Sequence, residues 1–299
     1  MSGNKPRLTA EDAVAFLTSA FGEIQDFHAL SEGEESRAFG FTRDGEPLVL
    51  RVNISRHGFE MDRMARERFG PAGLPVPAIG LIAPLGPYHA CVSERASGTT
   101  LQGLAADDAY RHGAAICQLL DQMGRCDMAW SAGYGPISPD GRGRYENWPD
   151  FLVSLMKKDW SLLSSTQAAH LSPLLKRIEN EAKGAENVRG LIHGDFGSNN
   201  VLVAAGRVTG LIDWSEAMVG NPLYDLANIF FWRPWLDCME QQCRYIIEKE
   251  PGRLAQRDRI AALAIHIGLE TAHEAAQAGD RALTDWALSR CTTLLETGI

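Results

Sequence analysis

One polar segment, His193 to Asn200, limits the fold of this chain more than any other stretch. Apolar runs lie before and after it, and they are Gly190 to Ile192, Val201 to Val203 and Val208 to Ile212. Short apolar runs bounded by glycine and polar residues are typical of buried strands. The segment is therefore expected to be the loop between two strands, and Asp213 is expected at the end of a third.

The rest of the pattern predicts two regions of different structure. In the first third, alternating apolar residues and turn signals predict antiparallel strands at Ser36 to Thr42, Pro47 to Asn53, Ile79 to Pro84 and Tyr88 to Glu94. A helix capped by Thr9 precedes them, and a second helix is expected over Gly58 to Phe69. After Gly98 helical periodicity dominates, and the glycine-rich stretch Ala132 to Asn147 is expected to be a long loop.

The polar segment and Asp213 carry the residues that phosphoryl transfer requires. Asp195 and Asn200 are five residues apart, so one loop can direct a carboxylate at a hydroxyl and an amide oxygen at a metal. Asp213 can hold the same metal, because magnesium prefers hard oxygen ligands. Phosphoryl transfer depends on positioning and charge neutralisation rather than on covalent chemistry. A lone His-Gly-Asp would indicate only a turn, but the full set predicts a kinase.

These residues resemble those of the aminoglycoside phosphotransferase family, which shares the eukaryotic-type protein-kinase fold. The resemblance covers nearly the whole chain and is carried by Leu30 to Phe39, Val49 to Asn53, Asp195 to Leu202, Ile212 to Met218 and Ala227 to Leu236. It implies an α+β, bilobal, protein-kinase-like fold. A small antiparallel-sheet lobe over residues 1–95 would bind the nucleotide, and a larger, mainly helical lobe over residues 96–299 would carry catalysis and bind the substrate.

The resemblance also implies the reaction. We expect ATP and magnesium as cofactors and a hydroxyl of an aminocyclitol or aminoglycoside antibiotic as the acceptor, with the 4-hydroxyl of hygromycin B favoured. Asp195 would be the catalytic aspartate, and Asn200 and Asp213 would bind magnesium. Asp225 would brace the catalytic loop, unless it is an ordinary helix-capping or solvated carboxylate. His193 would order the loop, because Asp195 already fills the role of base.

Five residues are expected near the nucleotide by the same resemblance: Ser36, Arg51, Asp62, Ser93 and Arg95. The loop over the phosphates has a single glycine, Gly33, so the Ser36 hydroxyl would do more of the binding. Arg51 stands where most relatives have lysine, and a forked guanidinium does not replace an ammonium conservatively. Asp62 is the favoured acidic partner of Arg51, with Glu60 and Glu67 left open. Ser93 and Arg95 lie in the expected hinge.

The acceptor contacts are predicted from residue type alone. Trp232 and Trp235 could stack on sugar or cyclitol rings, although tryptophans in helical regions more often belong to the core. Polar or acidic contacts to the ammonium groups of the acceptor are expected from Asn199, Glu216, Glu240 and Glu270.

Composition excludes several other classes of protein. A net charge of -9 argues against non-specific nucleic-acid binding, which needs a basic surface. The six cysteines have neither zinc-site nor disulfide-framework spacing, and no signal peptide or membrane span is visible. We expect a cytoplasmic monomer without nucleic-acid or membrane partners. Two alternatives stay open: a kinase of this fold acting on another aminoglycoside, a macrolide or a small metabolite, and a non-catalytic nucleotide-binding protein.

Overall fold

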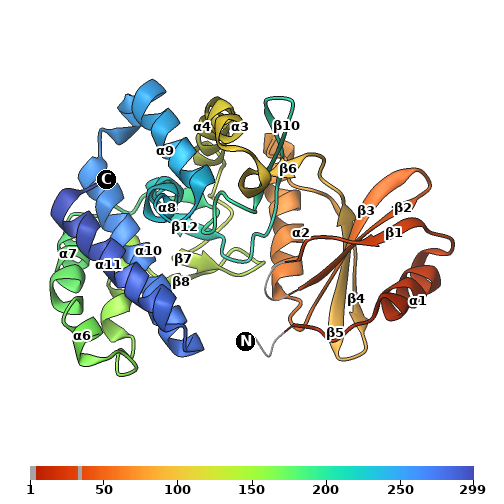
Figure 1. Ribbon diagram of the computed structural model, residues 1–299, viewed down its shortest axis with the longest axis horizontal. Helices are drawn as coiled ribbons and strands as arrows, with labels where there is room; N and C mark the ends of the chain where they lie inside the picture. The colour runs from red at the N-terminus through yellow and green to blue at the C-terminus, as the bar shows by residue number, and fades with distance from the viewer. Residues whose placement is uncertain (1–4, 33–35) are drawn as a thin grey trace. The chain divides into compact units, whose positions relative to one another are not determined.

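The computed structural model describes residues 5–32 and 36–299, which form two compact units (Figure 1). The first unit comprises the chain up to Gly98 together with Thr209–Ser215, and the second comprises Thr99–Val208 and Glu216–Ile299. The sequence placed a boundary at residue 95. It gave no sign that Thr209–Ser215 returns to the first unit, because that return depends on packing rather than on local pattern.

The first unit contains one five-stranded antiparallel sheet in the order β1-β2-β3-β5-β4. The strands are β1 (Gln25–Ala29), β2 (Arg37–Arg43), β3 (Glu46–Asn53), β4 (Ile79–Leu85) and β5 (Tyr88–Glu94). Four of them were predicted within one or two residues. β1 was not, and its central residue is the only one that is not exposed, so it has little of the apolar alternation that marks a strand.

Two helices cover the opposite faces of this sheet (Figure 1). Helix α1 (Ala10–Phe21) begins with the predicted cap, where the Thr9 hydroxyl accepts the Asp12 N–H at 3.1 Å. Its buried residues share a core with Leu50 and Val52 of β3. Because side chains alternate along a strand, Arg51 between them faces the other side, where α2 (His57–Phe69) lies.

The second unit contains a four-stranded antiparallel sheet in the order β8-β7-β12-β9. Its strands are β7 (Tyr134–Ile137), β8 (Gly143–Tyr145), β9 (Gly190–Ile192) and β12 (Met218–Gly220). The prediction of a long loop over Ala132 to Asn147 was therefore wrong, since β7 and β8 lie within it. Pairing with β12, which is distant in sequence, stabilises β7, and local composition cannot reveal such a partner.

The rest of the second unit is mainly helical, which confirms the α+β class. The helices are α3 (Ala106–Arg111), α4 (Gly113–Gly124), α5 (Trp148–Val153), α6 (Ser165–Ala168), α7 (Leu171–Lys183), α8 (Leu223–Trp232), α9 (Asp237–Lys249), α10 (Arg257–Ala278) and α11 (Arg281–Thr297). Short strands β6 (Thr99–Thr100) and β10 (Val201–Ala204) pair with each other, and β11 (Arg207–Leu211) leads back into the first unit. Helix α8 is buried from Tyr224 to Phe231.

Among residues 5–32 and 36–299, no helix is both long and apolar enough to cross a membrane. The six cysteines are all buried, and none forms a disulfide.

A histidine in α10 is enclosed completely by this helical core. His266 is fully buried, packs against the Phe151 ring at 4.7 Å between centroids, and lies 3.2 Å from the Tyr224 hydroxyl through Nδ1. Burial lowers the pKa of His266 from 6.5 to about 4, although Glu270 partly opposes this effect. The side chain is therefore neutral at physiological pH.

His266 should make the protein less stable in mild acid. Between pH 6.5 and about 4 the unfolded chain binds a proton that the folded chain does not, so stability present above pH 6.5 is lost as pH falls toward 4. The loss from this group is at most about 3 kcal/mol. Urea unfolding at pH 7.5 and 4.5 measures the free energy of unfolding, which should fall less between the two pH values in His266→Gln than in the wild type. The same substitution at exposed His57 is the control, and equal pH dependence in wild type and His266→Gln would contradict the prediction.

Candidate functional site

The loop from His193 to Asn200, called the catalytic loop below, joins β9 to β10 as predicted. Two of its glycines cannot be replaced without strain, since Gly194 has φ of +90° and Gly197 has φ of +112°. A Cβ on Gly194 would lie 2.1 Å from the Glu216 carbonyl oxygen, and one on Gly197 would lie 2.3 Å from Met239 Cε. The loop therefore fits tightly against the segment at Glu216 and against α9.

Helix α8 holds this loop from its first turns. The buried Asp225 carboxylate accepts the N–H of His193 at 2.8 Å and the N–H of Gly194 at 3.0 Å. One turn later, Asn228 donates to the carbonyl oxygen of Phe196 at 2.9 Å. Burial raises the pKa of Asp225 to about 6, while His193 and the two N–H donors lower it. Asp225 is thus placed to brace the loop, and the buried His193 is part of the braced backbone.

Asp195 and Asn200 are joined directly within the loop. The Asn200 Nδ2 donates to Asp195 Oδ2 at 2.7 Å and to the Asp195 carbonyl oxygen at 2.9 Å. Both amide hydrogens are used in this way, which leaves Oδ1 as the Asn200 atom suited to a cation. Asn200 is buried, whereas Asp195 and the neighbouring Asn199 are exposed. The loop presents a carboxylate to solvent and keeps the amide behind it.

Asp213 belongs to the first unit, two residues beyond β11. Its φ of +61° is unusual for a residue other than glycine. The Ser215 hydroxyl donates to Asp213 Oδ1 at 2.8 Å, and the Asp213 side chain is exposed. The next residue, Trp214, is fully buried against Phe69 with ring centroids 5.5 Å apart. Trp214 thus anchors the segment that presents the Asp213 carboxylate.

Arg51 forms an ion pair with Asp62, the partner that the sequence favoured. Asp62 is buried in α2, and its other oxygen accepts the Trp214 N–H at 3.0 Å. The alternative Glu60 instead pairs with Arg56 at the surface. Burial lowers the pKa of Arg51, but Asp62, Cys91 and Asp213 outweigh it, so this pKa lies above its ordinary value. Arg51 is charged at every physiological pH.

The other predicted nucleotide contacts also belong to the first unit. Ser36 directly precedes β2, and Gly33 lies outside the residues that the structure describes. Ser93 is buried in β5, opposite Val49 of β3. The Arg95 backbone N–H donates to the Pro47 carbonyl oxygen at 3.1 Å. The nucleotide role of these residues stays a prediction.

The predicted acceptor contacts fall into two groups. Trp235 and Glu216 are exposed, and Trp232 is half-buried at the end of α8. Two of the predicted carboxylates already have a cation, since Glu240 pairs with Arg233 and Glu270 pairs with Lys158. Sequence reasoning missed Lys158, and it missed Trp286, which contacts both predicted tryptophans. No motif marks these two residues, because each reaches its partners from a distant helix or turn.

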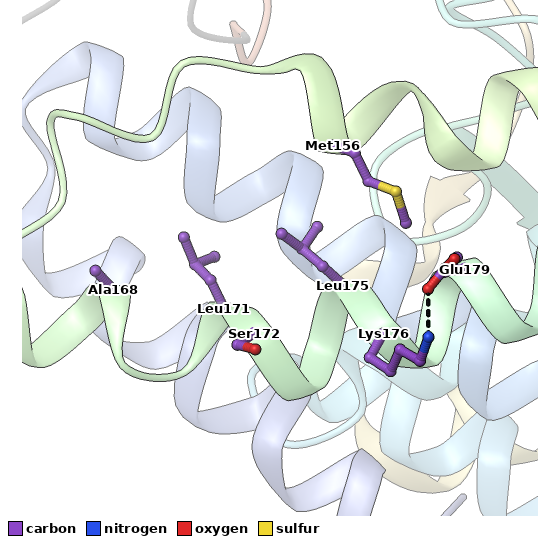
Figure 2. Close-up of a pocket in the computed structure, with 7 residues that line it drawn as sticks. All are labelled: Met156, Ala168, Leu171, Ser172, Leu175, Lys176 and Glu179. Carbon is purple, nitrogen blue, oxygen red and sulfur yellow. Dashed lines mark hydrogen bonds and ion pairs between the residues drawn. The ribbon is translucent and has the colours of Figure 1, made fainter.

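A cavity of about 580 Å³ lies elsewhere in the second unit, along α6, α7 and Met156 (Figure 2). It is open, and Figure 2 shows apolar side chains beside the Lys176–Glu179 ion pair, whose atoms are 2.7 Å apart. None of the predicted site residues lines it. The predicted catalytic and metal-binding residues lie instead on the catalytic loop of the second unit and beside the Arg51–Asp62–Trp214 group of the first.

Comparisons with known proteins show the family and the fold of the chain. Residues 26–265 match the phosphotransferase enzyme family. The chain is 40% identical to "Hygromycin-B 4-O-kinase" of Escherichia coli, over 98% of this chain and 87% of that protein. It is similar to the crystal structure of aminoglycoside phosphotransferase APH(4)-Ia, with a TM-score of 0.92 and 38% identity over 97% of this chain and 100% of that one.

A thermostable mutant of APH(4)-Ia, solved as a ternary complex with AMP-PNP and hygromycin B, is also similar. Its TM-score is 0.89, with 39% identity over 94% of this chain and 97% of that one. These matches confirm the fold that the sequence predicted.

Loss of the Asp62 charge should cost far more than loss of the neighbouring Glu60 charge. Asp62→Asn would leave the half-buried Arg51 guanidinium facing an amide at a buried position, at a cost of about 3 kcal/mol in unfolding free energy. Glu60→Gln removes only a surface pair and should cost under about 1 kcal/mol. Urea unfolding of the two variants at pH 7.5 measures this difference. Equal losses of unfolding free energy would show that the Arg51–Asp62 pair stabilises the fold no more than the surface pair does.

Asp225→Asn should loosen the catalytic loop. The amide has one acceptor oxygen, so one of the two buried N–H donors would face an NH₂ group, at a cost of about 1–3 kcal/mol. Amide hydrogen exchange of residues 190–200 should accelerate at pH 7.5. Asp258→Asn, in the first turn of α10 and exposed, is the control and should change neither exchange nor stability by more than about 1 kcal/mol. Unchanged exchange in Asp225→Asn would refute the bracing role.

Proposed function

The chain belongs to the phosphotransferase enzyme family, and we propose that it uses ATP and magnesium to phosphorylate a hydroxyl of an aminocyclitol antibiotic. The first candidate is the 4-hydroxyl of hygromycin B. The near full-length identity to a hygromycin-B 4-O-kinase supports this substrate, and a solved relative holds both hygromycin B and an ATP analogue. The observation that carries the proposal is the exposed Asp195 carboxylate, fixed by Asn200 on a loop that α8 braces.

Asp195 would orient the acceptor hydroxyl and take its proton. The hydroxyl oxygen forms a bond to the γ-phosphorus of ATP, the bond from that phosphorus to the bridging oxygen breaks, and ADP leaves. An exposed carboxylate suits this role, because an incoming hydroxyl can reach it directly. The hydrogen bond from Asn200 to Asp195 Oδ2 holds the carboxylate in a fixed orientation for this role.

The residues present suit magnesium. Asn200 Oδ1 and the Asp213 carboxylate are hard oxygen donors, and Asp213 is exposed. When bound, the ion would neutralise charge on the nucleotide phosphates. Arg51, held in position by Asp62, would contact the same phosphates through its guanidinium.

The biological consequence follows from charge. A phosphate adds about two negative charges to a cationic drug that binds ribosomal RNA, so the product should bind less well. We therefore infer a role in antibiotic resistance. The enzyme would act in the cytoplasm, where both ATP and ribosomes are present.

The decisive experiment incubates purified protein with ATP, magnesium and hygromycin B. Mass spectrometry should show one added phosphate, and phosphorus–proton correlation should place it on O4. Asp195→Asn should lower kcat by about 10²–10⁴-fold while keeping nucleotide affinity, because it removes the base and not the binding groups. Chelation of magnesium should stop turnover.

An acceptor panel separates the alternatives. It contains another aminoglycoside, a macrolide, choline and homoserine, each scored by ADP release. Faster turnover of one of these than of hygromycin B would replace the substrate assignment. Tight ATP binding without ADP release for any acceptor would favour a non-catalytic protein.

A further inference from the structure

Three tryptophans meet at the end of α8, and they are called the tryptophan cluster below: Trp232, Trp235 and Trp286. Trp286 of α11 stacks on Trp232 with ring centroids 5.3 Å apart and planes 14° apart. It meets Trp235 edge to face at 4.7 Å and 66°. Such pairs add about 0.5–1.5 kcal/mol beyond the area that they bury. Trp286 is thus the common partner of both tryptophans that the sequence singled out.

Backbone contacts fix the elements that carry these rings. Arg290, one turn after Trp286, donates to the carbonyl oxygens of Phe230 at 2.9 Å and Phe231 at 3.3 Å. These carbonyls lie in the last turn of α8, where helix acceptors lack intrahelical donors. Arg290 therefore fastens α11 to the end of α8, at the point where Trp286 meets Trp232.

The turn that carries Trp235 is also fixed. The Trp235 N–H donates to the Trp232 carbonyl oxygen at 2.9 Å. Arg233 of the same turn bonds to Glu240 of α9, with Nη2 3.1 Å from Oε1. Glu240 is thereby used to brace the turn, while the Trp235 ring itself contacts Trp286.

Trp235 is nevertheless half exposed, at 50% of its surface. A single exposed apolar side chain is ordinary in a soluble protein. This one differs because its ring already packs against Trp286 and its backbone N–H is hydrogen-bonded. A ring held in advance loses little conformational entropy when a ligand covers it, so more of the contact energy becomes affinity.

The helices on either side of the Trp235 turn also contact the catalytic loop. Helix α9 begins directly after Trp235 and Leu236, and Met239 in its first turn lies against Gly197 of the catalytic loop. Helix α8, which ends at Trp232, bonds to Phe196 of the same loop through Asn228. The two helices on either side of the Trp235 turn thus both contact the catalytic loop.

We infer that Trp286 is a positioning residue, which holds the exposed ring of Trp235 as a platform for the acceptor. The platform would take a ring of an aminocyclitol, with its C–H face or a ring ammonium over the indole. Tryptophan is the aromatic side chain that attracts ammonium groups best, and the effect grows as the pair is desolvated. This inference rests on the proposed function, because it assigns one recognition surface for that acceptor.

The test compares the Michaelis constants of two substrates. Trp286→Leu should raise the KM for hygromycin B about tenfold, with kcat and the KM for ATP within about twofold. Trp286→Phe should restore most of the affinity, because it keeps an aromatic partner for Trp235. Trp235→Leu should raise the same KM, and the double variant should raise it less than the product of the two single effects. Trp130→Leu, placed beside the β7–β8 hairpin, is the matched control and should leave the KM unchanged.

A spectroscopic readout separates positioning from general damage. Hygromycin B alone should change the tryptophan fluorescence of the wild type and of Trp130→Leu, and this change should be lost in Trp235→Leu. An unaltered KM for hygromycin B in a folded Trp286→Leu would overturn the inference. If Trp286→Leu does not fold, Trp235→Leu provides the test, because the Trp235 ring is half exposed and its loss should disturb the fold less. An unaltered KM for hygromycin B in Trp235→Leu would also overturn the inference. If the wild type phosphorylates no aminocyclitol, both the proposed function and this inference are wrong. If the wild type is active and the variants have an unaltered KM for hygromycin B, only the inference is wrong.

Discussion

The two hydrogen bonds from the backbone of His193 and Gly194 to Asp225 are the interaction on which the catalytic loop depends. Both donors sit directly after β9, where the chain turns through Gly194 with a φ of +90°. A buried N–H without a partner costs about 1–3 kcal/mol. A carboxylate supplies two acceptors from one side chain, and α8 delivers it as part of its own first turn.

In the first unit, Asp62 likewise uses both carboxylate oxygens to hold other groups. One oxygen of this buried carboxylate meets Arg51, and the other accepts the Trp214 N–H. In both units the supporting carboxylate is buried and fully bonded, whereas the carboxylates assigned to chemistry, Asp195 and Asp213, are exposed. This division follows from energetics, because a buried charge needs partners and a reacting one needs access.

Sequence reasoning found the elements whose signal is local. The strands of the first sheet, the Thr9 cap and the loop between β9 and β10 all follow from residues within a few positions of one another. It failed for the stretch Ala132 to Asn147, where glycine-rich composition indicated a loop although β12 pairs with β7. It also could not show that Lys158 forms an ion pair with Glu270, because that lysine comes from a distant segment of the chain.

From the sequence alone came the prediction of a kinase, through a loop with Asp195 and Asn200 and a strand end with Asp213, while the family resemblance implied the bracing role of Asp225. These depend on short spacings, which fix residue types and their order along the backbone. The tertiary structure alone decided which carboxylate Arg51 would meet and which aromatic ring would support Trp235. Such pairings join residues that are far apart in the chain, and packing rather than local pattern selects them.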